Sequence, residues 1–554
     1  MTSQPMTHSS HVDTFARDHL PPAEQWPVFL FDAPELQYPE LLNVTSELVD
    51  SHISQGRAAN PALHGQSVDG PFTWSYQTLQ QKVDQIAFVL TRDMGLVAGN
   101  RLLLRGANSP MMAACFLAGL KAGLVMVPTM PLLRAAELHT VMDKAQVSAA
   151  LCASNLADEL TYCLDATHPQ HTPCLTHVMP FGGAHGDRLE HLMAQYTQPF
   201  QAHPTTRDDV CLIAFTSGTT GSPKGTMHFH RDVMAMCDLF PRHVLHMTPK
   251  DVVCGTPPIA FTFGLGGLLA FPLRYGASTV LLEKHSPETL LQTIAKYKAT
   301  QCYTAPTFYR QMAALAHGFD VSSLQHPVSA GEALPDATRQ LWKQQTGIEI
   351  TDGIGGTEMI HIYIASAGKQ ARPGSIGQVV PGYVAQIVDE EMHPVPPGTP
   401  GRLAIRGPTG CRYLSDPRQT DYVKQGWNLP GDTFVVSADG YFSYMARNDD
   451  MIISAGYNIA GPEVEGALMQ HPAVSECGVV GIADPERGQI VMAFVALKPE
   501  YSADADMVET LQNFVKKNIA PFKYPRRIQF IPALPRTETG KLQRFRLRQM
   551  ATHP

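Results

Sequence analysis

The sequence lacks the features that mark several classes of protein. Its ten cysteines are scattered and no two have Cys-x-x-Cys spacing, which argues against a disulfide framework or a zinc site. Its net charge of −8 gives no basis for binding nucleic acid or an anionic membrane. Lys121 and two glycines interrupt the longest apolar stretch, residues 111–128, and the N-terminus has no charged-then-apolar leader pattern. These absences predict a cytoplasmic protein with reduced thiols.

The pattern that is present alternates between helical and strand periods. At 554 residues the chain is longer than a single core usually supports, and its 44% hydrophobic content is ordinary for a globular protein. Short apolar runs predict strands at 101–106, 124–128 and 278–283. Residues 286–298 predict a helix that Ser286 caps and Pro287 begins. The alternation predicts an α/β fold with parallel-rich sheets layered with helices.

The pattern of turn-forming residues changes in the last third of the sequence. After about residue 375 turn signals such as PVPPGTPG become frequent, which predicts a β-rich subdomain. A charged, turn-forming stretch near 446–450 is followed by about 100 residues with their own helix and strand pattern. We therefore expect a large N-terminal domain over 1–447 and a small α+β domain over 448–554.

The stretch TSGTTGSPKG (216–225) follows the apolar run VCLIAF, which predicts a buried strand. Clusters of Gly, Ser, Thr and Pro usually form surface turns. Here glycines would let backbone N–H groups approach an anion, the hydroxyls add donors, and Lys224 adds a positive charge. The spacing differs from the GxxxxGK[ST] loop of ordinary NTPases. The stretch suits a polyphosphate, but it does not establish nucleotide binding by itself.

Four other polar stretches stand out, and each is weak alone. They are TDGIGGTEM (351–359), NLPGD (428–432), ARNDDMI (446–452) and PRTETGKLQR (535–544). A Thr-Glu pair is usually a solvated helix start, a Gly-Asp turn is usually only a turn, and a lone lysine near the C-terminus is nearly always solvent-facing.

In this order and spacing the stretches resemble the motifs of the adenylate-forming superfamily, which includes acyl-CoA synthetases, peptide-synthetase adenylation domains and luciferases. TSGTTGSPKG resembles its phosphate loop, GIGGTE its second nucleotide motif, ARNDDMIISAGYN its hinge and following loop, and PRTETGK its C-terminal lysine motif. The resemblance covers roughly residues 45 to 545. One stretch departs from it: the family usually has aromatic-Arg-Thr-Gly-Asp, whereas LPGD keeps Asp432 without that arginine and threonine.

The resemblance implies ATP-dependent activation of an acid in two steps. The carboxylate attacks the α-phosphate of ATP to give acyl-AMP and pyrophosphate, and a thiol, that of coenzyme A, then displaces AMP. Because two anions meet in the first step, the site needs positive charge and hydrogen-bond donors. The implied residues are Thr216, Ser217, Gly218, Thr219, Thr220, Gly221 and Lys224 at the phosphates, Thr357 at the α-phosphate, Glu358 as the Mg²⁺ ligand, Gly331, Glu332, Ala333, Asp352, Gly353 and Ile354 around adenine, and Asp432 and Arg447 at the ribose.

The resemblance also implies that the C-terminal domain acts in both steps. During adenylation Lys541 would bridge the carboxylate and the α-phosphate. After this domain turns about a hinge at Asp449, the residues Ser454, Ala455, Gly456 and Tyr457 would line the pantetheine tunnel. The alternatives are a rigid domain and a solvated lysine.

Three stretches of the sequence bear on the identity of the acyl substrate. In PPIAFTFGLGG (257–267) the residues Phe261, Thr262 and Phe263 could form part of a flat pocket, with Ile360 and His361. The spacing in GIGGTEMIHIY resembles benzoate-CoA ligases, and DHLPPAEQWPVF (18–29) resembles the narrower 2-aminobenzoate-CoA ligase group. We therefore expect an aromatic acid, with 2-aminobenzoate or benzoate favoured; a core histidine remains the alternative for His361.

Other functions stay open at this point. They are adenylation for a separate carrier protein, a non-aromatic acid, a luciferase-like oxygenase, and a degenerate nucleotide-binding scaffold. The sequence ends 13 residues after Lys541, which leaves no room for a fused carrier, and the retention of Lys224, Glu358, Asp432 and Lys541 argues against a scaffold. The expected partners are the acid, ATP and coenzyme A, and a homodimer is one option for assembly.

Overall fold

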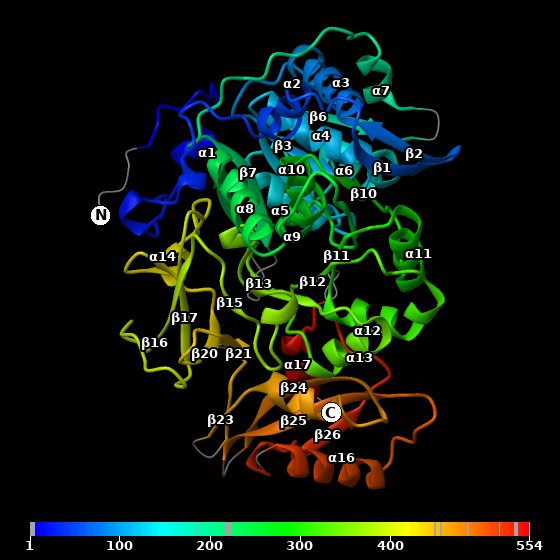
Figure 1. Cartoon of the computed structure of the whole chain (residues 1–554). Coiled ribbons are helices and arrows are strands. Elements are labelled where there is room, and N and C mark those ends of the chain that lie inside the picture. The colour runs from blue at the N-terminus through cyan, green and yellow to red at the C-terminus, as the bar shows by residue number, and fades with distance from the viewer. Residues whose placement is uncertain are drawn as a thin grey trace.

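The computed structural model describes residues 6–183, 186–216, 223–447, 450–454, 457–484, 487–519, 521–536 and 541–552. Within these residues four β-sheets and their helices form a large upper region and a smaller lower region, which contains the end of the chain (Figure 1). The mixture of parallel-rich sheets, a β-rich subdomain and a small α+β domain is the predicted fold class, which is thereby confirmed.

The first large sheet leads into the predicted phosphate loop. Its order is β6-β5-β3-β4-β7-β8, parallel throughout except for the last pair. Its strands are β3 (Arg101–Arg105), β4 (Val125–Thr129), β5 (Ala149–Ala153), β6 (His177–Phe181), β7 (Val210–Thr216) and β8 (Lys224–Phe229). The predicted strands at 101–106 and 124–128 are thus confirmed, and both are wholly buried, as expected of strands covered on both faces.

The second large sheet has nine strands. Its order is β15-β14-β13-β12-β11-β9-β10-β1-β2, parallel in the centre and antiparallel at both edges. The strands are β1 (Pro61–Ser67), β2 (Gly70–Ser75), β9 (Val252–Gly255), β10 (Ser278–Val280), β11 (Gln301–Thr304), β12 (His326–Ser329), β13 (Thr351–Gly355), β14 (Ile362–Ser366) and β15 (Gln378–Val379). The strand predicted over 278–283 stops at Val280, because the exposed Glu283 already belongs to the loop before the next helix.

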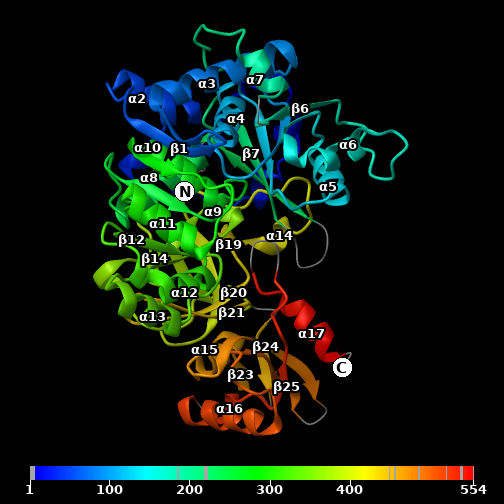
Figure 2. The same cartoon turned by 90° about the vertical axis from the view of Figure 1, so that its right-hand side faces the viewer.

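Helices cover these sheets (Figures 1 and 2). The longer ones are α3 (Tyr76–Phe88), α4 (Pro110–Lys121), α5 (Ala135–Ala145), α8 (His230–His243), α11 (Pro287–Tyr297), α12 (Pro306–Leu315) and α13 (Asp336–Thr346). In α11 the Ser286 side chain accepts a hydrogen bond from the Thr289 N–H, which confirms the predicted cap. Helix α4 is apolar on almost every side because it is buried, apart from Lys121, whose ammonium pairs with Asp50 and Asp84. No helix among the described residues is long and apolar enough to cross a membrane.

The β-rich subdomain lies beside the nine-stranded sheet and places two predicted ribose residues. Its antiparallel strands are β16 (Val384–Val388), β17 (Gly401–Arg406), β18 (Val423–Lys424), β19 (Trp427–Asn428), β20 (Asp432–Val436) and β21 (Phe442–Arg447). The hairpin of β20 and β21 pairs Asp432 directly with Arg447. The two side chains therefore meet because of strand register, although they are 15 residues apart in the sequence.

The C-terminal region has its own sheet and its own apolar core. The strands are β22 (Ile452–Ser454), β23 (Tyr457–Ile459), β24 (Val474–Asp484), β25 (Gly488–Leu497) and β26 (Arg527–Phe530), with helices α15 (Gly461–Leu468), α16 (Ala505–Asn518) and α17 (Arg544–Thr552). This region lies at the bottom of Figure 1 and Figure 2. The predicted boundary between 447 and 448 stays a prediction, since residues 448 and 449 lie outside the described ranges.

Candidate active site

The predicted phosphate loop connects two strands, β7 and β8, that pair antiparallel. Strand β7 enters it and β8 leaves it antiparallel, so that Thr216 is paired with Lys224 across its base. The hydroxyl of Thr216 is buried and makes no hydrogen bond to the described residues of the chain. Residues 217–221, which hold the predicted Ser217, Gly218, Thr219, Thr220 and Gly221, lie outside the described residues. The pairing of these strands therefore places Lys224 next to Thr216 and its hydroxyl.

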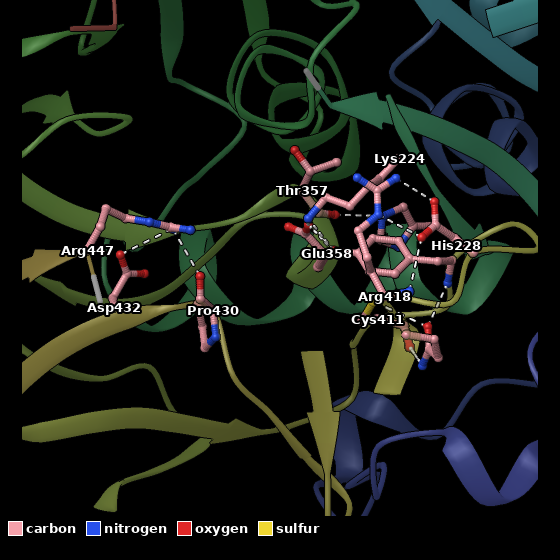
Figure 3. Close-up of polar contacts among 12 residues, drawn as sticks. Lys224, His228, Thr357, Glu358, Cys411, Arg418, Pro430, Asp432 and Arg447 are labelled. Atoms are coloured by element: carbon pink, nitrogen blue, oxygen red, sulfur yellow. Dashed lines mark hydrogen bonds and ion pairs between the residues drawn. The ribbon is translucent and has the colours of Figure 1, made fainter. Parts of the chain in front are cut away.

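Lys224 meets the predicted metal ligand Glu358 at this point (Figure 3). The Lys224 ammonium lies 3.5 Å from Oε1 of Glu358. The hydroxyl of Tyr413 bonds to both groups: it accepts a hydrogen bond from Lys224 Nζ at 2.8 Å and donates one to Glu358 Oε1 at 2.6 Å. A cation, a hydroxyl and a carboxylate thus lie together beside the loop.

Thr357 and Glu358 lie on a short 3₁₀ turn, η8 (Thr357–Met359), which follows β13. The Nε2 of His228 lies 2.8 Å from the Thr357 carbonyl oxygen and donates to it. Ile360, just after the turn, has φ 64°, which a β-branched residue adopts only under strain. Such strain costs of order 1–3 kcal/mol and persists where the surroundings hold the backbone firmly. The turn is therefore held in place by its neighbours.

Asp432 keeps its place although LPGD replaces the usual motif. The Arg447 guanidinium lies 3.3 Å from Oδ1 of Asp432 and donates to the Pro430 carbonyl oxygen at 3.0 Å (Figure 3). Gly431 has φ 83°, a conformation that glycine adopts without a Cβ penalty. The hairpin thus fixes the carboxylate without the missing arginine and threonine.

The residues predicted around adenine lie on two neighbouring strand ends. Gly331, Glu332 and Ala333 follow β12, and Asp352, Gly353 and Ile354 lie on β13, which pairs in parallel with β12. Burial raises the pKa of Asp352 to about 7, although the Arg339 guanidinium lies 3.3 Å away. Burial also raises the pKa of the Glu332 carboxyl, although the positive charge of Arg536 acts to lower it.

The predicted C-terminal lysine lies beside this strand edge. A Cβ built on Gly331 would lie 3.9 Å from Cε of Lys541. Arg536, five residues earlier, donates to Glu332 at 3.2 Å and to Glu476 of the C-terminal sheet at 2.9 Å. The C-terminal region therefore presents its lysine motif to the larger region of the molecule, and an arginine joins the two.

The predicted thioester residues are only partly described. Ser454 is buried on β22 and pairs with Gly488 of the C-terminal sheet. Tyr457 is the first residue of β23. Ala455, Gly456 and the hinge residue Asp449 lie outside the described ranges.

The residues predicted to bind the aryl group lie on two segments, which meet where His361 contacts Phe263. Phe261 precedes the short helix α9 (Thr262–Gly264), Thr262 is buried, and Ile360 and His361 follow η8. The His361 ring lies 5.7 Å from that of Phe263 and its Nε2 is 3.3 Å from the Phe263 carbonyl oxygen. Burial lowers the pKa of His361 to about 3, so that the imidazole is neutral at physiological pH.

Three residues of this neighbourhood escaped the sequence reasoning: Tyr413, His228 and Arg536. Tyr413 and His228 lie in CRYLSD and TMHFH, which carry no spacing signal of their own. Arg536 belongs to PRTETGK, where a second basic residue near the predicted lysine could have been weighed as a contact between the two regions.

Comparison with known proteins identifies the family of the chain. The AMP-binding enzyme family matches residues 52–413 and the AMP-binding enzyme C-terminal domain matches residues 463–541. The chain belongs to the AMP-binding enzyme family. It is therefore an AMP-forming acid–thiol ligase of the adenylate-forming superfamily, as the sequence motifs predicted.

Three relatives with long alignments are aryl-CoA ligases. A benzoate–CoA ligase of Thauera aromatica is 33% identical over 93% of this chain and 97% of its own. The structure of the anthranilate CoA ligase AuaEII in complex with anthranoyl-AMP matches with TM-score 0.87 and 31% identity, over 94% of this chain and all of that one. A benzoate CoA ligase from Burkholderia xenovorans LB400 matches with TM-score 0.81 and 30% identity, over 92% of this chain and 100% of that one.

Proposed function

We propose that this ligase activates an aromatic carboxylate, 2-aminobenzoate or benzoate, with ATP and transfers it to coenzyme A. The observation that carries the proposal is the contact of His361 with Phe263, immediately after the Thr357–Glu358 turn. The rings of Phe240, Phe263 and Phe271 lie 5.8, 5.7 and 4.5 Å from the His361 ring. Aromatic side chains beside the acid-activating turn favour a flat, apolar acyl group.

The neutral imidazole also bears on the ring substituent. Since Nε2 of His361 faces the Phe263 carbonyl, that nitrogen carries the proton and Nδ1 is left as an acceptor. Nδ1 is buried and makes no hydrogen bond within the described residues of the chain. An N–H group on the acid could satisfy this acceptor, which favours 2-aminobenzoate over benzoate.

The phosphate site supplies the charge for the first step. Lys224 and the hairpin N–H groups would meet the β- and γ-phosphates, and Thr357 the α-phosphate. Glu358 fits a Mg²⁺ ion that takes its other ligands from phosphate and water, because Mg²⁺ is usually bound through one or two carboxylates together with phosphate oxygens. When bound, the ion would neutralise phosphate charge. Asp432 would accept from the ribose hydroxyls.

The orientation of the C-terminal region suits adenylation. Lys541 lies beside Gly331, from where its ammonium would bridge the acid carboxylate and the α-phosphate. For the second step this region would turn about Asp449, and Ser454 to Tyr457 would line the path of the pantetheine thiol. In this proposal the chain divides into its two domains between residues 447 and 448.

A panel of acids tests the proposal. Pyrophosphate release is measured with ATP and Mg²⁺ for 2-aminobenzoate, benzoate and a medium-chain fatty acid, and the thioester products are identified by mass spectrometry with coenzyme A. We expect turnover of the two aromatic acids, with 2-aminobenzoate preferred. Turnover of the fatty acid alone would replace the aryl assignment by a non-aromatic one. Adenylation without transfer to coenzyme A would point to a carrier protein as acceptor.

A further inference from the structure

Tyr413 bonds to both charged groups of the phosphate site. Its hydroxyl accepts from Lys224 Nζ at 2.8 Å and donates to Glu358 Oε1 at 2.6 Å, while these two charged atoms stay 3.5 Å apart. We infer that Tyr413 is a positioning residue that holds Lys224 and Glu358 in a loose ion pair and keeps them from closing to hydrogen-bond distance, so that both groups are available to a nucleoside triphosphate and its metal ion. The inference rests on the proposed roles of Lys224 and Glu358.

The hydroxyl of Tyr413 is held at this place by the backbone around it. The Tyr413 N–H donates to the Gln419 side chain at 2.9 Å. The neighbouring residues bond to β8 on either side, since Leu414 N–H donates to the Gly225 carbonyl and Met227 N–H to the Arg412 carbonyl, both at 2.8 Å. The tyrosine therefore lies alongside the strand that begins with Lys224, and its side chain is fully buried.

The same segment fixes the turn that carries Glu358 by separate contacts. Thr409 Oγ1 donates to the Met359 carbonyl oxygen at 2.9 Å. Arg412 pairs with Asp232, which lies 3.8 Å from His228, and His228 in turn holds the Thr357 carbonyl. The backbone of the turn is thus positioned without the Tyr413 hydroxyl. Removing that hydroxyl changes the relation of Lys224 to Glu358 and leaves the turn in place.

Electrostatics explains why a spacer matters here. The attraction between opposite charges grows as their separation shortens, and it is screened weakly at buried sites. The side chains of Lys224 and Glu358 are only 22% and 12% exposed. Without the hydroxyl the pair would close to hydrogen-bond distance and become tighter, and an incoming polyphosphate would first have to break it. The expected consequence is weaker binding of the nucleotide.

Calorimetric titration of the full-length protein with ATP and Mg²⁺ tests this inference. In Tyr413→Phe we expect Kd to rise about tenfold, the usual scale for one hydrogen bond to a charged group. Phenylalanine keeps the ring and its contact with Tyr422, whose ring lies 5.9 Å away. The matched control is Tyr309→Phe, which removes a buried hydroxyl bonded to the Cys302 carbonyl at 2.6 Å. That control should leave Kd within about twofold.

A double-mutant cycle separates spacing from packing. In a Glu358→Gln background no ion pair can form, so adding Tyr413→Phe should change Kd less than about twofold. Equal effects of Tyr413→Phe in both backgrounds would overturn the inference, and so would an unchanged Kd in the single variant. The titration contains neither acid nor coenzyme A, so failure of the aryl assignment would leave this result unaffected. Loss of ATP binding in the unmodified protein would instead refute the ATP site itself.

Discussion

The turn that carries Thr357 and Glu358 and the segment that carries Lys541 are held in opposite ways. Buried contacts from His228 of β8 and from Thr409 fix the backbone of the turn, and its strained Ile360 is tolerated within them. Lys541 is exposed, and Arg536 near it links Glu332 to Glu476 through half-buried ion pairs. A firmly held group suits a charge that must be in place for every turnover. An exposed one suits a group that, in the proposed scheme, leaves the site after the first step.

Removing the positive charge of Lys541 should have the largest effect on the rate. In Lys541→Ala we expect the rate of pyrophosphate release to fall about a hundredfold or more, since in the proposed scheme the lysine acts where the carboxylate and the α-phosphate meet. Thioester formation from presynthesised acyl-AMP should stay near the unmodified rate. Quench-flow measurement of each half-reaction checks this, and equal losses in both would contradict the two-orientation scheme.

Loosening the contact between the two regions should have a smaller effect. Arg536→Gln removes the charge that pairs with Glu332 and Glu476, and we expect adenylation to slow by about tenfold while the thioester step slows less. The same single-turnover assays measure both rates. Lys298→Gln, which breaks an exposed ion pair with Asp320 far from the site, is the matched control and should change neither rate. If adenylation kept its rate in Arg536→Gln, the arginine would not be holding the two regions in this orientation.

A substitution of Thr262, in the predicted aryl site, should alter which acid the enzyme uses. Thr262 is buried and stands between Phe261 and Phe263 in the sequence. Its hydroxyl could accept a hydrogen bond from an ortho amine. Thr262→Val should lower kcat/KM for 2-aminobenzoate about tenfold relative to benzoate. Steady-state kinetics with both acids measures the ratio. Equal losses for the two acids would show that Thr262 is a β-branched spacer facing away from the ring.

The smallest effect concerns stability rather than rate. Burial lowers the pKa of His361 to about 3, so the unfolded chain binds more protons than the folded one between about pH 6.5 and pH 3. The contribution of His361 to stability is therefore present above its unfolded pKa and is lost as the pH falls, by about 1.4 kcal/mol per pH unit below 6.5. Denaturant unfolding from pH 7 to pH 5 should show a shallower loss in His361→Phe, and parallel curves would argue against a buried neutral histidine.

Local patterns predicted much of the fold because local physics decides those elements. The capped helix at 287–297 and the strands at 101–105 and 125–129 formed where periodicity and capping placed them. The family and its chemistry followed from motif order, which the comparisons confirmed. The roles of the individual site residues stay predictions. The strand at 278–280 came out shorter than its apolar run, since pairing with β1 and β9 decides where a strand ends.

The sequence by itself determined the family, the α/β class and the identity of the charged groups. Their residue types and spacing are local properties, readable without a fold. Only the tertiary structure decided that Tyr413 bonds to both Lys224 and Glu358, that His228 holds the Thr357 carbonyl, and that Arg536 joins the two regions. These contacts join residues from 55 to 204 positions apart in the chain. They arise from strand register and domain orientation, which no local sequence pattern specifies.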